Sequence, residues 1–349
     1  MTIRLSILLP VYNAEPFLLE CLDALLPQCS EGVEVLVLDD CSTDGSWATL
    51  QAVAATHAGR VKLLRHSQNQ GVSAARNSLL EAATGEYIWF LDADDQLVST
   101  AVATVLAGLA AFSPDWLLFD FQVLRQSQSL KHHLRGEHHR KTFIGPSNTL
   151  IHDTATLLEG LFLAGQFHPW SKVSRRTLWD EGACGPLRFP VGWLFAEDMA
   201  TFSRLALRAQ TAAYLNVPLV RYRQHAGNVM LCMTLPKIQG LSAALEGFSH
   251  DLAATPALQH RLRQTASLAF AISHLSARNY MAAMRFLAAH PELEHAADAA
   301  RAFARHYRHS SPLTPEELLQ AYWRRGWWAR YFRARRWLRH VPTLQESIG

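Results

Sequence analysis

The chain has 349 residues, 49% hydrophobic and 18% charged, which excludes a disordered protein and allows one large domain or two smaller ones. The net charge of +3 gives no support for nucleic-acid binding by the molecule as a whole. Five scattered cysteines without metal-ligand spacing indicate reduced thiols. With no apolar run near the ~20 residues that cross a bilayer, we expect a cytoplasmic protein without a signal peptide.

The first 95 residues alternate between predicted strands and helices. Asn13 is expected to cap the first helix, and Gly71 is expected to open a later helix that Gly85 terminates. Strands are expected at residues 3–9, 33–38 and 61–64. Strands and helices in regular alternation with short connections predict an α/β fold with a mostly parallel, doubly wound sheet.

Residues 87–95 are the most informative stretch. Five apolar residues predict a central strand buried on both faces, and Asp92, Asp94 and Asp95 follow it directly. Carboxylates enter a core only at a large desolvation cost, so we expect them at the carboxyl end of the strand, where open α/β sheets bind ligands. Such oxygen ligands suit Mg²⁺ or Mn²⁺ together with a phosphate. A solvated turn is the alternative.

The remaining chain is predicted to be mixed and then helical. Residues 126–150 are polar and rich in histidine, and we interpret them as a solvated loop because no apolar frame would hold the histidines around a metal. From Pro236 onward, alanine and leucine dominate and predict helices. Further helices are expected near residues 98–111, 153–164 and 197–209, and strands near 116–124 and 213–222.

Five segments together resemble the family 2 glycosyltransferases, which have the GT-A fold: residues 6–14, 36–46, 69–77, 90–95 and 195–199. The resemblance covers about the first 230 residues, and its order and spacing are most specific in the first hundred. Cys41 replaces the glycine in the family's Asp-Asp-Gly-Ser-Thr-Asp run. Residues 168–176 and 221–225 resemble segments of members that build lipopolysaccharide and capsule.

The resemblance implies an inverting enzyme that moves a sugar from a UDP-sugar to a hydroxyl of a glycan or lipid-linked glycan, with Mn²⁺ or Mg²⁺ as cofactor. It implies a nucleotide-sugar-binding half at residues 1–112 and an acceptor-binding half at 113–235 of a GT-A domain. A C-terminal helical region follows at 236–349. The implied contacts to the nucleotide sugar come from Pro10, Tyr12, Asn13, Asp39, Asp40, Arg76, Asp92 and Ala93.

The chemistry of UDP assigns tasks to the acids after the second strand. A carboxylate accepts the imide N–H of uracil well, so we expect this contact at Asp40, supported by Asp39. The alternative is that both carboxylates only hold the following turn. Arg76 lies one turn into its helix, within reach of the base or the phosphates, or else in a surface ion pair.

The family resemblance assigns metal binding and catalysis to four residues. Asp94 and His225 are expected to bind the metal, since the charge on the leaving diphosphate must be neutralised. Asp198 matches the family's catalytic base, with Glu197 in support; a helix cap is the alternative for Asp198.

Two acceptor-side expectations are less specific. Residues 189–193 look like an acceptor-side loop in which Gly192 permits a close approach. Trp170 is either a platform for a sugar or part of the core.

Two other functions stay open. A sugar nucleotidyltransferase would carry a glycine-rich loop with arginine and lysine after the first strand, where this chain has Pro-Val-Tyr-Asn-Ala at residues 10–14. A non-catalytic scaffold with the same fold is disfavoured by its intact acids.

Residues 322–340 contain seven arginines, six aromatic residues besides Tyr322, and no acid. As one helix they would be imperfectly amphipathic, with Gly326 weakening it. The apolar face would then hold Trp323, Trp327, Tyr331, Trp337 and Leu338, with Trp328 and Phe332 among the arginines. This composition favours peripheral attachment to an anionic membrane surface, on the inner face of the cytoplasmic membrane. Packing on the body or on a second subunit is the alternative, and nucleic acid is a weaker third.

Overall fold

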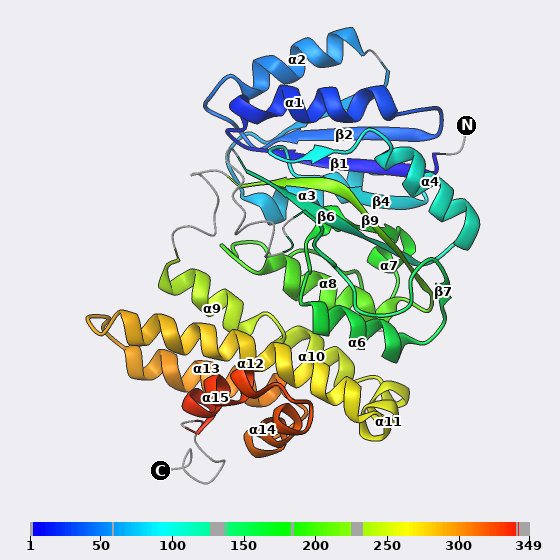
Figure 1. Cartoon of the computed structure of the whole chain (residues 1–349). Helices are drawn as coiled ribbons and strands as arrows, with labels where there is room; N and C mark the ends of the chain where they lie inside the picture. The colour runs from blue at the N-terminus through cyan, green and yellow to red at the C-terminus, as the bar shows by residue number, and fades with distance from the viewer. Residues whose placement is uncertain are drawn as a thin grey trace. The chain divides into compact units, whose positions relative to one another are not determined.

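The computed structural model describes residues 3–57, 59–125, 136, 138–182, 185–224, 233–339 and 341. It contains two compact units (Figure 1). The first, here called the sheet unit, comprises residues 1–154, 166–192 and 208–231. The second, the helical unit, comprises 155–165, 193–207 and 232–349. The functional boundaries predicted after residues 112 and 235 stay predictions.

A mixed sheet, nine-stranded within the described residues, forms the centre of the sheet unit. One half is parallel and runs in the order β3 (Val61–Arg65), β2 (Val33–Asp39), β1 (Leu5–Val11) and β4 (Tyr87–Phe90). Every residue of β1 and β4 is buried, as expected for parallel strands covered on both faces. The α/β prediction is confirmed.

Helices cover both faces of this parallel half. The chain moves outward from β1 to β3 through α1 (Glu15–Leu25) and α2 (Ser46–Thr56), and these two helices lie on one face (Figure 1). It then returns through α3 (Val72–Ala82), on the other face, to β4 on the far side of β1. The direction of winding therefore reverses between β1 and β4.

The other half of the sheet is partly antiparallel. Strand β8 (Lys172–Arg175) pairs antiparallel with β4 and with β6 (Trp116–Leu124). Strand β9 (Ala212–Arg223) runs parallel to β6 and antiparallel to β5 (Gln96–Leu97) and β7 (Leu150–Ile151). Shorter elements complete the unit: η1 (Leu26–Gln28), α4 (Ala101–Phe112), η2 (Pro169–Ser171) and α7 (Thr177–Asp180).

Two local predictions are wrong. Asn13 does not cap α1, because the cap position is Ala14 and Asn13 itself has a left-handed φ of 49°. Gly85 does not end α3, whose cap is Ala83. Gly85 is required for steric reasons, since a Cβ atom at this position would lie 2.5 Å from Ser6 Oγ.

The helical unit confirms the predicted helical C-terminal region. Its core surrounds the 24-residue α12 (Ala266–Ala289), which packs against α9, α13, α14 and α15. None of the helices among the described residues combines the length and the apolar character needed to span a bilayer. The other helices are α6 (Thr154–Ala164), α8 (Glu197–Arg208), α9 (Leu235–Ala243), α10 (Glu246–Ala253), α11 (Pro256–Gln264), α13 (Ala296–Ser310), α14 (Pro315–Arg324) and α15 (Trp328–Leu338).

The sequence predicted one continuous helix over residues 322–340, the basic-aromatic tail. The structure instead divides this segment between two helices, α14 and α15. Gly326, at a left-handed φ of 67°, donates its N–H to Trp323 O, and the N–H of Trp327 reaches Tyr322 O, both at 3.0 Å. These two bonds form a Schellman motif, which ends a helix at a left-handed glycine. The rings of Tyr322 and Trp327 stack across the motif with centroids 6.2 Å apart.

Candidate active site

The carboxyl ends of β1, β2 and β4 lie side by side at one edge of the sheet, because these strands are parallel neighbours. The winding reverses between β1 and β4, and open α/β sheets bind ligands at such a point. We call this the switch edge. The predicted donor residues that fall at these strand ends are Pro10, Tyr12, Asn13, Asp39, Asp40, Asp92 and Ala93.

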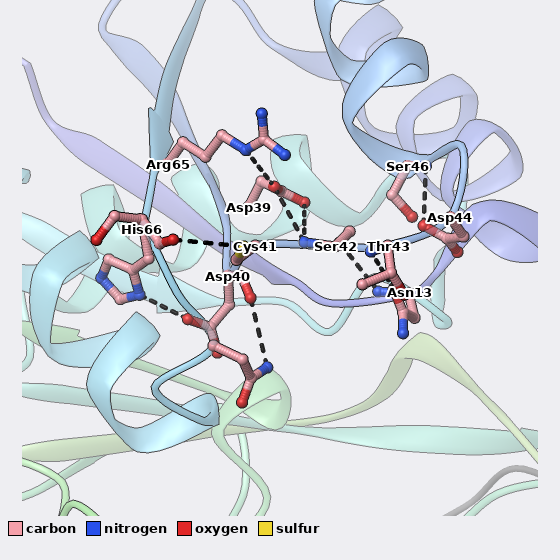
Figure 2. A network of polar contacts seen from close by, with 12 residues as sticks. Asn13, Asp39, Asp40, Cys41, Ser42, Thr43, Asp44, Ser46, Arg65 and His66 are labelled. Atoms are coloured by element: carbon pink, nitrogen blue, oxygen red, sulfur yellow. Dashed lines mark hydrogen bonds and ion pairs between the residues drawn. The ribbon is translucent and has the colours of Figure 1, made fainter.

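Asp39, the last residue of β2, is fully buried and joins two other segments. Its Oδ2 atom accepts a hydrogen bond from Arg65 Nε at 3.0 Å, at the end of β3 (Figure 2). The N–H of Ser42 contacts Oδ1 and Oδ2 at 3.3 and 3.2 Å. Asp39 therefore ties the end of β3 to the turn that follows β2.

Asp40 is more fully hydrogen-bonded and only 2% exposed. Its Oδ1 atom contacts His66 Nδ1 at 2.6 Å and accepts from the Gln70 N–H at 3.0 Å. Its Oδ2 atom accepts from the N–H groups of Gln70 and Gly71 at 3.2 and 2.8 Å. These contacts hold the neighbouring loop in place, which is the kind of role that the sequence analysis gave as the alternative. The contact of Asp40 with uracil stays a prediction.

Sequence reasoning missed the partners of these acids. Because a carboxylate only accepts, Nδ1 of His66 carries a proton, and Nε2 lies 3.0 Å from Ser78 Oγ on α3. Arg65 and His66 stand at the end of a parallel strand, as the aspartates do. That shared position is the signal that would have found them.

The loop after β1 is fastened to the acid-rich turn after β2. Asn13 donates its N–H to Ser42 Oγ at 3.0 Å, and its Oδ1 atom accepts from the Thr43 N–H at 2.8 Å (Figure 2). The N–H of Ala14 donates to Ser46 Oγ at 2.9 Å. The hydroxyl residues of the turn thus position the first loop of the switch edge.

Tyr12 and Cys41 differ in exposure from the buried acids of the switch edge. The Tyr12 side chain is 49% exposed. Cys41 is half-buried at a left-handed φ of 61°, a conformation that glycine adopts without strain. The cysteine therefore keeps the backbone shape that the family's glycine would have.

Arg76 reaches the switch edge from α3. It is 3% exposed, and its Nη2 atom donates to Asp92 Oδ1 at 3.0 Å. Its guanidinium group also lies 5.3 Å from the centroid of the Phe189 ring. Because Arg76 is buried, the alternative of a surface ion pair is wrong. Ala93, the next residue after Asp92, is also buried.

Asp95 marks an excess of negative charge after β4. It is 1% exposed; its Oδ1 atom accepts the Arg223 N–H at 2.9 Å, and Oδ2 has no hydrogen-bond partner among the described residues. Burial, together with the neighbouring Asp94 and Asp92 carboxylates, raises the pKa of Asp95 well above its usual range.

The predicted metal ligands are only partly visible. His225 lies outside the described residues. Within the described part of the chain, no group of three or more His, Cys, Asp and Glu side chains is placed to hold a metal. Magnesium is commonly bound by one or two carboxylates and by substrate phosphates. A half-exposed Asp94, next to an Asp95 oxygen that has no partner within the described part of the chain, fits that mode.

Phe189, the first residue of the predicted acceptor-side loop, is fixed to α3. Asn77 Nδ2 donates to Phe189 O at 2.9 Å, and the Phe189 N–H donates to Asn77 Oδ1 at 2.8 Å. Gly192 has a φ of 84° and no atom near the position of a Cβ. The left-handed backbone conformation by itself favours glycine here, and the close approach of an acceptor at Gly192 stays a prediction.

Trp170 belongs to the core. Its side chain is 1% exposed and stacks on His168 and Tyr222, with centroids 4.7 and 5.5 Å away. Burial, then the charge of Lys172, lowers the pKa of His168 to about 3, so the stack is neutral. The core alternative is therefore the one that the structure confirms for Trp170.

Glu197 and Asp198 are the first two residues of α8 and belong to the helical unit. Ala196 precedes them at a left-handed φ of 65°. Carboxylates in the first turn interact favourably with the helix dipole. Their catalytic roles stay predictions.

Comparisons with known proteins agree with this architecture. Residues 6–153 match the family described as Glycosyl transferase family 2. Glycosyltransferase GlyA of Streptococcus pneumoniae is 26% identical over 233 residues, which are 65% of this chain and 31% of GlyA. EpsH of Bacillus subtilis is 28% identical over 245 residues, 66% of this chain and 63% of EpsH. The chain thus spans less than two thirds of either relative.

A solved structure extends the likeness beyond the family match. The crystal structure of residues 1–349 of S. aureus TarS in complex with UDP-GlcNAc superposes with a TM-score of 0.70 at 19% identity. The match covers 92% of this chain and 87% of that chain. At this identity the likeness shows the fold. Residues 6–153 are thus similar to the family 2 glycosyltransferases, and the chain as a whole has the GT-A fold with a helical C-terminal region.

Proposed function

We propose that the protein is an inverting glycosyltransferase that moves a sugar from a UDP-sugar to a hydroxyl of a glycan or lipid-linked glycan in the synthesis of a cell-surface polysaccharide. The observation that carries the proposal is the switch edge, where carboxylates from two strand ends meet in a chain similar to the family 2 glycosyltransferases. The UDP-GlcNAc complex of a protein with the same fold supports a UDP-linked donor.

The reaction needs one bond formed and one broken. The acceptor oxygen attacks the anomeric carbon of the sugar, while the bond from that carbon to the diphosphate oxygen breaks and UDP leaves with the electron pair. The acceptor proton goes to Asp198, with Glu197 positioning the acceptor. A bound Mn²⁺ or Mg²⁺ would neutralise the leaving group. We assign Asp94 to hold this ion, with Asp92 oriented by Arg76.

For the uracil contact, the hydrogen bonds favour a revised assignment between the two acids. Asp40 is engaged by His66, Gln70 and Gly71, so its task is to shape the loop before α3. Among the described residues, Asp39 Oδ1 accepts only the Ser42 N–H, at 3.3 Å, and it retains capacity to accept the imide N–H. Asp39→Asn should therefore weaken UDP binding more than Asp40→Asn, when both are compared at equal folded fraction by calorimetry.

The activity is tested with the full chain and a panel of UDP-, GDP- and CDP-sugars, with water as the acceptor and release of the nucleoside diphosphate as the readout. We expect release from a UDP-sugar. Asp198→Asn should lower it at least ~10²-fold without changing UDP affinity. Glu292→Gln, an exposed acid of the same unit, is the matched control. Near-native release by Asp198→Asn would exclude it as the base and direct attention to Glu197.

Two outcomes would replace the proposal. A nucleotidyltransferase would release pyrophosphate from UTP and a sugar 1-phosphate, and would show little donor hydrolysis. A non-catalytic scaffold would bind UDP in calorimetry and turn over no donor in the panel.

A further inference from the structure

The α14–α15 hairpin is an integral part of the helical unit. Tyr322, Ala334 and Leu338 are at most 1% exposed and belong to the core built around α12. The buried His274 Nδ1 lies 2.8 Å from Tyr322 Oη, and the Schellman motif at Gly326 fixes the angle between the helices. The outward face of the hairpin is therefore presented by a folded support.

That outward face carries large aromatic side chains. Trp323, Trp328 and Phe332 are 55, 60 and 59% exposed. Tyr331 joins them, since its ring centroid lies 5.3 Å from that of Trp323 and 5.2 Å from that of Phe332. We call these four residues the aromatic patch. Tyr12 is the other exposed large aromatic residue in the described part of the chain.

The continuous-helix prediction placed these rings incorrectly. Trp323 was expected on the same face as Leu338, yet Leu338 is buried and Trp323 is exposed. Trp328 and Phe332, expected to interrupt a polar face, form the patch together with Trp323 and Tyr331. The break at Gly326 turns the two helices so that their exposed rings converge.

The sequence that forms the patch is positively charged, and the acids of the hairpin, Glu316 and Glu317, lie in the first turn of α14. Residues 322–339 include seven arginines and no acid. Arg325, Arg330 and Arg336 lie over the rings of Phe270, Trp327 and Trp337, at 3.9, 4.0 and 5.4 Å from the centroids. Arg324, Arg333 and Arg339 are exposed.

We propose that the α14–α15 hairpin docks on a bilayer that contains anionic phospholipids. The aromatic patch inserts at headgroup depth, and the exposed arginines contact the lipid phosphates. Within the patch, rings meet edge-to-face or tilted, at 66, 80 and 45°. They therefore do not form the row of open ring faces on which the bases of a single strand stack. The proposal is independent of the proposed transfer reaction.

Flotation of the full chain with vesicles provides the test. Because deletion of the tail would remove core residues, point substitutions are used. We expect the protein to float with vesicles of equal parts phosphatidylglycerol and phosphatidylcholine, and not with phosphatidylcholine alone. The triple variants Trp323→Ser/Trp328→Ser/Phe332→Ser and Arg324→Gln/Arg333→Gln/Arg339→Gln should each bind at least ~10-fold more weakly. High salt should weaken binding of the native protein.

Matched controls change the same chemistry elsewhere. Leu19→Ser/Val217→Ser removes exposed apolar side chains from the sheet unit, and Arg60→Gln/Lys62→Gln removes exposed charges there; both should float as the native protein does. Thermal unfolding by circular dichroism checks each variant. If a triple variant does not fold, Phe332→Ser alone should still lower binding measurably.

Three results would overturn the proposal. The first is unchanged flotation of the folded aromatic variant. The second is self-association, seen by sedimentation and lost in that variant, without any vesicle binding by the native protein; the patch would then be an interface between copies. The third is binding of a single-stranded oligonucleotide that the variants abolish, again without vesicle binding.

Discussion

The acids that follow β2 and those that follow β4 lie at the same edge of the sheet, yet Asp95 has fewer donors around it than Asp39 and Asp40 have. Asp39 and Asp40 are buried, and their oxygens are engaged by Arg65, His66 and backbone N–H groups. After β4, one Asp95 oxygen has no hydrogen-bond partner among the described residues, and burial, followed by the acids around it, raises the pKa of Asp95. All of these residues are aspartates, so the difference arises from the number of hydrogen-bond donors that the neighbouring elements supply to each carboxylate.

This difference indicates separate tasks. A carboxylate that accepts as many hydrogen bonds as Asp40 does stabilises the fold, and its removal leaves buried donors unpaired. A cluster with an excess of negative charge destabilises the fold until a cation arrives, which is typical of a binding site. Substitution of aspartate by asparagine should therefore have different consequences at the two strand ends.

The largest effect is expected at Asp94. Asp94→Asn should lower donor turnover at least ~10²-fold, because the leaving diphosphate loses its cation, and should abolish the Mn²⁺ dependence of UDP binding. Calorimetry with and without Mn²⁺ measures the second effect. Asp23→Asn, at an exposed position on α1, is the control. Equal UDP affinity of the native protein in both conditions would contradict the assignment.

The next largest effect concerns stability at the end of β2. Asp40→Asn should lower the free energy of unfolding by about 2–3 kcal/mol, because the amide is a weaker acceptor for the N–H groups of Gln70 and Gly71. Urea unfolding measures the change, with the exposed Glu81→Gln as control. An unchanged midpoint would show that these contacts contribute little.

At the end of β4 the same exchange should act in the opposite direction. Without metal, Asp95→Asn should raise the free energy of unfolding by about 1 kcal/mol, since it removes a buried charge beside Asp92 and Asp94. The asparagine Oδ1 atom still accepts the Arg223 N–H. A loss of stability like that of Asp40→Asn would remove the distinction between the strand ends.

The smallest effect isolates the backbone of the turn after β2. Cys41→Gly should raise the free energy of unfolding by less than about 1 kcal/mol, because glycine adopts the left-handed φ without strain but loses more entropy on folding. Cys41→Ala keeps the Cβ atom and removes the thiol, so it should leave stability near native. If alanine gave the larger gain, the thiol and not the backbone would be the source of strain.

The fold was predictable from the sequence because apolar runs and strand-end acids obey local rules. Residues 87–91 identified a buried strand, and the acids after it marked the ligand edge. The partners of those acids were not predictable in the same way. His66 and Gln70 meet Asp40 only because β2, β3 and the start of α3 converge, which depends on the tertiary arrangement.

In residues 322–340 the prediction failed because of a local feature and not because of the tertiary arrangement. The hydrophobic period over residues 322–340 assumed one helix, and Gly326 entered the prediction only as a weak helix former. In the structure, Gly326 ends α14 through two hydrogen bonds, and that single residue changes which rings face outward. A glycine flanked by aromatic residues that can stack across it was the available signal.

The hydrogen bonds from Gln70 and Gly71 to Asp40 have a kinetic consequence. Both amides precede α3, outside any strand, yet their acceptor is a buried side chain at the end of β2. We expect their protons to exchange with solvent as slowly as those in the middle of β2, since release requires the strand end to open. This loop should therefore share the opening timescale of the sheet and keep its shape while a donor enters and leaves.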